Sequence, residues 1–265
     1  MQKLRIGVVS YLNAMPLWFS LQREADIALY PDNPARLAAR MAEGALDVAV
    51  LPAVEALRQP GLSFFPDLGV GADGPVESVG LFTRAELAEV RAVALTAASR
   101  TSQALARVLL HAAGARPAYS EADIAPESLA ARGEDAVLMI GDPCLRARKL
   151  AHDRVFVDLG AEWKLETGLP FVFALWAGPA RNLTPALHGR LTAALQEGRA
   201  RIYELADAFS LETGLTDNEL GHYLEDVIQN RLGPEHARGL AEFARRAAAL
   251  GLLPPDAPTR AAIAT

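Results

Sequence analysis

Short apolar runs recur through the first two thirds of the chain, and a stretch with a helical pattern separates most of them from the next. Runs of this length that alternate with helices are typical of an α/β fold with a mainly parallel sheet. The last third is almost entirely helical from Pro185 onwards. The runs predicted to be strands are Arg5–Val9, Asp47–Leu51, Ser78–Phe82, Ala92–Leu95, Ala136–Ile140 and Pro170–Trp176.

Two segments are candidates for crossings between lobes. Gly69–Phe82 is rich in glycine before it becomes strand-like, and Leu159–Trp176 carries Gly168 and Pro170 before an apolar run. We therefore predict two α/β lobes: a discontinuous first lobe, 1–84 plus 175–265, which includes the helical C-terminal part, and an inserted second lobe, 85–174. Ligands of such bilobal proteins bind in the cleft, at strand carboxyl ends and helix N-termini.

Composition excludes several classes of function. Apolar residues make up 51 % of the 265 residues, and the net charge of −6 is spread without long blocks of one sign, which argues against a nucleic-acid partner. Cys144 is the single cysteine, so no intramolecular disulfide can form. No apolar stretch is long enough to cross a membrane. The N-terminal residues enter a strand almost at once, without the apolar segment of a secreted precursor, so we expect a cytoplasmic protein.

Polar turns follow two of the predicted strands. Ser10, Tyr11 and Asn13 follow the first, and the segment 99–102 (Ser-Arg-Thr-Ser) precedes a clear amphipathic helix. The first turn of a helix has unpaired N–H groups and a partial positive charge, so added hydroxyls make a seat for a carboxylate or phosphate. Capping alone would explain Asn13, or Ser99 or Thr101, taken singly. As clusters, the two turns would suit a ligand with two anionic ends.

Two further polar residues, Asp142 and Ser78, each have two possible roles. Asp142 precedes Pro143 after a strand, which is typical of a helix N-cap, and we favour capping over a catalytic acid. Ser78 lies near the first crossing, where its hydroxyl could face the cleft or belong to an ordinary strand. Phosphate-binding loops, metal-binding patterns and the Gly-x-Ser-x-Gly elbow are absent from the sequence, and we expect neither a cofactor nor a metal.

Six blocks together resemble the chorismate dehydratase family of the futalosine route to menaquinone. The resemblance runs in order from Arg5 to about Gly178. A sister enzyme of the route, the dihydroxynaphthoate synthase, shares the fold, but its typical Ser-Pro-Cys-Pro-Asn motif is absent here. The blocks are VVSYLNAMPL, DVAVLPAVEAL, ESVGLF, ALTAASRTSQALARVLL, LMIGDPCL and EWKLETGLPFVFALWAG.

The resemblance implies a bilobal type II periplasmic-binding-protein-like fold and a cytoplasmic hydro-lyase without cofactor. The substrate would be chorismate, a small dicarboxylate, and the products 3-[(1-carboxyvinyl)oxy]benzoate and water. A substrate carboxylate could take the ring proton, with Asp142 as the rival base. Cys144 and Arg146 depart from the residues expected in their block. By motif position, the catalytic residues would be Asn13 and Ser78, and the substrate-binding residues Ser10, Ser99, Thr101, Ser102 and Asp142.

Other functions on the same fold stay open at this point. One is a solute-binding protein, a class that is normally exported. Another is a ligand-sensing domain, which would usually be fused to a DNA-binding segment for which residues 1–9 leave no room. The third is the sister synthase. Apolar helix faces after Pro185 fit either a cover for the first lobe or self-association, and they leave the oligomeric state undetermined.

Overall fold

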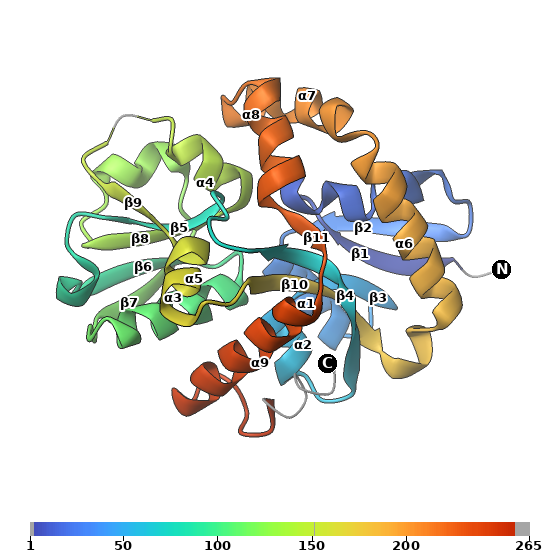
Figure 1. Cartoon of the computed structure of the whole chain (residues 1–265), viewed down its shortest axis with the longest axis horizontal. Helices are drawn as coiled ribbons and strands as arrows, with labels where there is room; N and C mark the ends of the chain where they lie inside the picture. The colour runs from blue at the N-terminus through green and yellow to red at the C-terminus, as the bar shows by residue number, and fades with distance from the viewer. Residues whose placement is uncertain (1–2, 151, 258–265) are drawn as a thin grey trace.

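Two α/β lobes lie side by side in the computed structural model, which describes residues 3–150 and 152–257 (Figure 1). Each lobe is built on one sheet. Within the described residues, the first sheet has the order β11 (Gln229–Arg231), β4 (Leu62–Ala72), β10 (Phe171–Pro179), β3 (Val48–Pro52), β1 (Leu4–Val9) and β2 (Ile27–Asp32). The second has the order β7 (Ala118–Ala122), β6 (Ala92–Thr96), β8 (Ala136–Ile140), β5 (Val79–Thr83) and β9 (Val155–Asp158).

Helices cover both sheets and form most of the C-terminal part. The α-helices are α1 (Pro34–Ala42), α2 (Ala53–Arg58), α3 (Arg100–Ala112), α4 (Gly141–Ala147), α5 (Leu159–Thr167), α6 (Pro185–Arg199), α7 (Ile202–Thr213), α8 (Asp217–His222) and α9 (Pro234–Ala249). Short 3₁₀ segments are η1 (Leu12–Leu17), η2 (Phe19–Arg23), η3 (Leu87–Glu89), η4 (Pro126–Ala131) and η5 (Ala180–Asn182), and η6 (Tyr223–Val227) is a π-helical turn.

The α/β architecture and all of the predicted strands are confirmed, within a few residues at their ends. The strands β2, β4, β7, β9 and β11 were missed. Four of these are edge strands. Neither β7 nor β9 contains a fully buried residue, and β9 has only four residues, so neither shows a long apolar run. The fifth, β4, contains Gly69, where a Cβ atom would come within 2.2 Å of the Ala174 carbonyl oxygen. Glycine is needed there for β10 to approach, although it weakens the strand pattern.

The pairing of the strands shows that the chain crosses between the lobes at earlier residues than the predicted boundaries, 84/85 and 174/175. β5 pairs with β8 and β9 in the second sheet, whereas all of β10 pairs within the first sheet. The chain therefore crosses at residues 73–78 and again near Gly168 and Pro170. These are the glycine- and proline-containing parts of the two segments, where regular pairing is interrupted.

A buried aromatic cluster joins the two lobes. Trp163 of α5 packs against Phe171 of β10 and Phe243 of α9, with ring centroids 5.3 and 6.2 Å away. The Trp163 indole N–H donates to the carbonyl of Pro170 at 3.2 Å. Truncating a buried aromatic side chain of this kind costs about 3–5 kcal/mol, so the cluster contributes strongly to the attachment of the lobes. Phe171 also packs on Phe173, at 4.7 Å between ring centroids.

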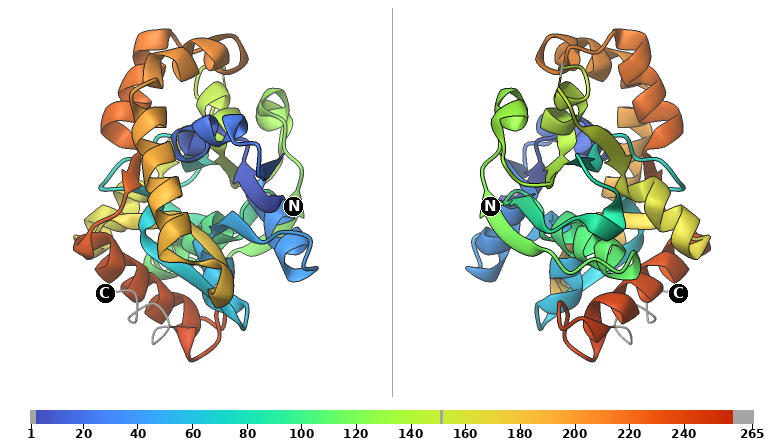
Figure 2. Two further views of the ribbon diagram at one scale, coloured as in Figure 1. Left: turned by 90° about the vertical axis from the view of Figure 1, so that its right-hand side faces the viewer. Right: turned by 90° about the vertical axis from the view of Figure 1, so that its left-hand side faces the viewer.

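The C-terminal helices cover the first lobe and then reach the second (Figure 2). Helix α6 packs on η1, where a Cβ atom at Gly198 would lie 2.2 Å from the Pro16 carbonyl oxygen. Helix α7 contacts both η1 and α4, and Lys149 pairs with Glu219 of α8 at 2.6 Å. Of the two roles considered for this part of the chain, covering the first lobe is observed, and α7 and α8 extend that cover across the cleft.

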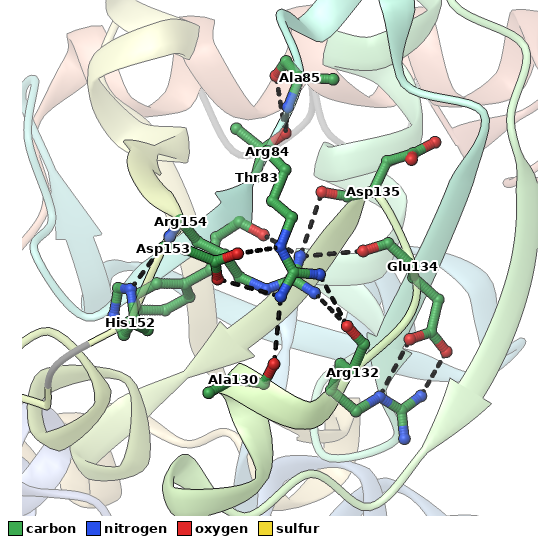
Figure 3. Close-up of polar contacts among 11 residues, drawn as sticks. Thr83, Arg84, Ala85, Ala130, Arg132, Glu134, Asp135, His152, Asp153 and Arg154 are labelled. Atoms are coloured by element: carbon green, nitrogen blue, oxygen red, sulfur yellow. Dashed lines mark hydrogen bonds and ion pairs between the residues drawn. The ribbon is translucent and has the colours of Figure 1, made fainter.

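Two arginines, Arg84 and Arg154, form a cluster of polar contacts in the second lobe (Figure 3). The buried Arg154 guanidinium donates to the carbonyls of Arg132, Glu134 and Asp135 at 2.7–3.1 Å. Arg84 donates to the Arg132 carbonyl and to the Asp153 carboxylate, both at 2.7 Å. These bonds attach the loop before β8 to β5 and β9. We therefore assign this cluster a structural role.

Candidate active site

A small cavity of about 40 Å³ lies between the lobes, where the carboxyl ends of β1 and β8 face the start of α3. One water needs roughly 10–15 Å³ of such space, so this conformation has room for only a few waters. An organic ligand needs more space than this conformation offers. The lining residues are Val9, Tyr11, Asn13, Pro34, Val70, Val79, Ser99, Ser102, Ile140, Gly141, Phe173 and Ala174.

The two polar turns meet at this cavity, as the sequence predicted. Asn13 comes from η1 of the first lobe, while Ser99 and Ser102 come from the start of α3 in the second. The Ser99 hydroxyl caps α3 by accepting the Ser102 N–H at 3.4 Å, and the Ser102 hydroxyl donates to it at 3.2 Å. Ser99 therefore both caps the helix and lines the cavity. Its position at a helix N-terminus favours an anionic ligand group.

Ser10 and Thr101, two members of the predicted set, lie elsewhere, as does Arg100 of the 99–102 turn, and the predicted Ser78 and Asp142 do not line the cavity either. Ser10 is exposed at the end of β1, where its N–H donates to the Asp32 carbonyl. Thr101 is fully buried, and its hydroxyl accepts the Val54 N–H at 3.1 Å, which attaches α3 to the start of α2. Arg100 lies 3.7 Å from the Glu55 carboxylate. None of the three is among the residues that line the cavity.

Asp142 joins the lobes, and the prediction that it caps its own helix is wrong. Helix α4 begins after Ile140, so Asp142 lies within its first turn. The buried carboxylate instead accepts the Leu12 N–H of the first lobe, with its two oxygens at 3.1 and 3.2 Å. It therefore satisfies the first N–H of η1, a group that the helix cannot bond internally, and fixes the turn that carries Asn13.

Ser78 is completely buried at the first crossing, next to Val79 of the cavity wall. The preceding residue, Glu77, has a φ of 62°, an uncommon conformation for a residue other than glycine. The Asp158 carboxylate supports it by accepting the Glu77 N–H at 2.6 Å, while the same carboxylate caps α5. Backbone strain of this kind persists only where the surroundings enforce it. The position of Ser78 is therefore tightly specified.

Sequence reasoning missed two residues that hold the predicted ones. The Tyr223 hydroxyl donates to the Ser78 Oγ at 2.6 Å, and the Asn230 side chain donates to the carbonyls of Asn13 and Gly69, both at 3.1 Å. Tyr223 and Asn230 come from the C-terminal helical part, far from their partners in sequence. No motif marks either residue, so only the folded chain reveals them.

Both tyrosines at the site are held in the protonated form. Burial and the nearby Asp142 carboxylate raise the pKa of Tyr11 to about 12. Burial raises the pKa of Tyr223 well above its usual value of 10, although hydrogen bonding with Ser78 and Asn13 acts in the opposite direction. At neutral pH each phenol therefore keeps its proton and can donate a hydrogen bond.

The lobes touch at Gly141, and alanine there should weaken this contact. Gly141 has a φ of +63°, and a Cβ atom would lie 2.7 Å from the Tyr11 ring. Gly44 has a similar φ of +70° with open space around it. We expect both Gly→Ala variants to lose about 1 kcal/mol or more of unfolding free energy from backbone strain. Gly141→Ala alone should also increase the radius of gyration in small-angle scattering. Equal stability loss and an unchanged radius for the two variants would contradict the lobe contact.

No group of three or more histidine, cysteine, aspartate or glutamate side chains in residues 3–150 and 152–257 is placed to hold a metal ion. Over the same residues, none of the helices combines the length and the apolar character that a bilayer crossing requires.

Comparison with known proteins places these features in a family. A family model described as menaquinone biosynthesis matches residues 4–249. The chorismate dehydratase of Thermus thermophilus is 34 % identical over 270 residues, which cover 96 % of each chain. That of Campylobacter jejuni is 24 % identical over 254 residues, with 93 % of this chain and 98 % of the relative covered.

A solved structure supports the fold. The periplasmic aliphatic sulphonate binding protein of Escherichia coli superposes with a TM-score of 0.67 at 17 % identity, covering 98 % of this chain and 91 % of that one. Together with the two sheets, this likeness confirms the periplasmic-binding-protein-like fold with two lobes.

Proposed function

The chain belongs to the menaquinone biosynthesis family, and we propose from this premise that it is a chorismate dehydratase. This hydro-lyase converts chorismate into 3-[(1-carboxyvinyl)oxy]benzoate and water. The observation that carries the proposal is the meeting of Asn13 with Ser99 and Ser102 in one inter-lobe cavity, in a chain 34 % identical to a chorismate dehydratase over nearly its whole length.

The substrate matches the two polar turns. Chorismate carries one carboxylate on its ring and one on its enolpyruvyl group, and each turn offers neutral donors to one of them. The dipole at the start of α3 contributes about 0.3–1 kcal/mol when exposed and up to ~2 when partly buried. A hydrogen bond to a charged group adds about 1.5–3 kcal/mol. The hydroxyls of Ser99 and Ser102 therefore matter as much as the helix itself.

The reaction removes a hydrogen from the ring carbon that bears the ether and a hydroxyl from the neighbouring carbon. The C–H electron pair becomes a ring double bond, the C–O bond breaks, and the proton and hydroxide leave as water. Aromatisation of the ring supplies the driving force. We assign proton abstraction to a carboxylate of the substrate, held by the Asn13 amide and the Ser78 hydroxyl, so that the protein contributes mainly orientation.

Closure of the lobes completes the site in this proposal. The cavity of about 40 Å³ is too small for chorismate, so the lobes open to bind it and close again around it. A closed cleft excludes water and strengthens each hydrogen bond to the carboxylates. We also place the reaction in the futalosine route and in the cytoplasm, as the resemblance of the motifs implies.

Ultraviolet absorbance tests the activity directly. Purified protein mixed with chorismate should produce a benzoate-like chromophore, with one molecule of product formed for each molecule of chorismate consumed. A protein that binds chorismate without any spectral change would instead be a binding protein on the same fold.

Asp142→Asn distinguishes the two candidate bases in the same assay. The asparagine keeps one oxygen that can accept the Leu12 N–H, which Asp142 accepts at 3.1 and 3.2 Å, so η1 should stay in place. With a substrate carboxylate as base, kcat should fall by less than about tenfold, since general bases typically contribute about 10²–10⁴-fold. A collapse of kcat with unchanged binding of chorismate would make Asp142 the base.

A further inference from the structure

We propose that Tyr223 is a positioning residue for the dehydration, acting through the hydroxyl of Ser78 and the amide of Asn13. The inference rests on the proposed function, because that function gives Ser78 and Asn13 their roles. It also assigns a task to the C-terminal helical part, which carries Tyr223 from the first lobe to the crossing between the lobes.

The contact between Tyr223 and Ser78 is short and shielded from solvent. Tyr223 is 1 % exposed and Ser78 is 0 % exposed. The Tyr223 Oη donates to the Ser78 Oγ at 2.6 Å, and the Asn13 side chain acts on the same phenol by lowering its pKa. Three segments distant in sequence therefore converge on one hydroxyl: the opening turn, the first crossing and the C-terminal helices.

The direction of this bond determines what Ser78 can do. Because the Ser78 oxygen accepts the proton of Tyr223, its own proton must point to a different partner. Ser78 is not itself among the residues that line the cavity, but Val79, the next residue, and Asn13 are. In the proposed complex the Ser78 proton therefore turns towards a carboxylate bound beside these two residues. Tyr223 thus orients Ser78 as a donor towards the substrate and keeps the serine from turning back into the protein.

The backbone and the packing around Tyr223 fix the position of its phenol. It begins the π-helical turn η6, closed by a hydrogen bond from the Ile228 N–H to the Tyr223 carbonyl at 3.0 Å. Such turns are rare and often occur at functional sites. The neighbouring Leu220 and Leu224 are fully buried, and the ion pair of Lys149 with Glu219 anchors α8 to the second lobe. These contacts hold the phenol against Ser78.

The role differs from acid–base catalysis. The phenol stays protonated through the neutral range, since burial raises its pKa well above 10. Tyr223 should therefore add no ionisation to the profile of kcat between pH 6 and 9, roughly the range in which catalytic groups usually titrate.

The test is the kinetics of Tyr223→Phe, Ser78→Ala and the double variant with chorismate. We expect Tyr223→Phe to lower kcat by about 10–100-fold, with KM changed less than about threefold, as for loss of an interaction made in the transition state. In the Ser78→Ala background it should have no further effect on kcat, because residues that act through one another are not additive. The shape of the pH profile should not change.

Tyr203→Phe is the matched control. Tyr203 lies on α7, and its hydroxyl donates to Glu225 at 3.2 Å, away from Ser78. The control loses the same kind of bond in the same helical segment, and its kcat should equal that of the wild type. Each kcat is measured per folded protein, from circular dichroism, below the unfolding transition of the variant.

The outcomes separate this inference from the proposed function. An active wild type with an unchanged Tyr223→Phe overturns the inference alone, as do additive effects with Ser78→Ala. A pH profile that loses a limb in Tyr223→Phe would make the tyrosine an acid–base group and also overturn it. A wild type inert towards chorismate overturns the proposed function, and the inference with it.

Discussion

Ser99→Asp should raise the KM for chorismate by about 100-fold, or about 2.8 kcal/mol of lost binding. Ser99 caps α3 and lines the cavity. Aspartate caps a helix as well as serine does, because its side-chain oxygen accepts the same N–H, so the fold should be kept. The new negative charge would lie in a nearly buried site assigned to a substrate carboxylate, and like charges brought together there cost several kcal/mol. Steady-state kinetics by absorbance gives the KM.

Ser99→Asn is the control for this charge. Asparagine is also a good N-cap and is close in size to aspartate, but it is neutral. Its KM should stay within about tenfold of the wild-type value, because the variant loses only one modest hydrogen bond. Similar KM values for the two variants would mean that steric fit, and not charge, determines the effect. The anion seat at α3 would then be refuted.

The two polar turns could be located from the sequence because each combines local signals. A short apolar strand, a hydroxyl or amide and the start of a helical pattern lie within a few residues of one another. The two turns follow β1 and β6, which belong to different sheets, and they meet because the two lobes face each other across the cleft. Asn13, Ser99 and Ser102 accordingly meet in the cavity. The individual hydrogen bonds could not be located this way, as the neighbouring Thr101, which attaches α3 to α2, shows.

Asp142 shows where local reasoning fails. An aspartate before proline at the start of a helix fits a cap, and the expected cap needs only local geometry. In the folded chain the carboxylate accepts the Leu12 N–H, 130 residues away. The sequence contains no trace of this pairing, because a free N–H at the start of η1 can be satisfied by any acceptor that the other lobe presents.

The same holds for the residues that come from the C-terminal part. Tyr223 and Asn230 reach Ser78 and Asn13 over separations of 145 and 217 residues. Tyr223 belongs to a segment whose apolar residues recur at helical spacing, and Asn230 belongs to a short edge strand. Periodicity identifies the buried face of a helix, but it does not say which partner the face meets.

Asn13→Ala should produce the largest loss of activity, with kcat/KM lower by about 10²–10³-fold, the typical effect of removing one preorganised donor to a reacting oxyanion. Asn13 is 9 % exposed and lines the cavity, while its backbone carbonyl accepts a hydrogen bond from Asn230. Alanine removes the amide but leaves this backbone anchor. If the amide orients the substrate carboxylate that takes the proton, kcat should fall along with kcat/KM, since the interaction matters most in the transition state.

Asn182→Ala provides the comparison that isolates this effect. Asn182 donates from its side-chain amide to the Asp47 carbonyl at 2.8 Å, outside the set of residues that line the cavity. The same truncation there should cost about 1 kcal/mol of stability and leave kcat/KM unchanged. If Asn13→Ala changed only KM, the amide would serve binding alone. The substrate carboxylate would then need another group to orient it for proton abstraction, and Ser78 would take that role.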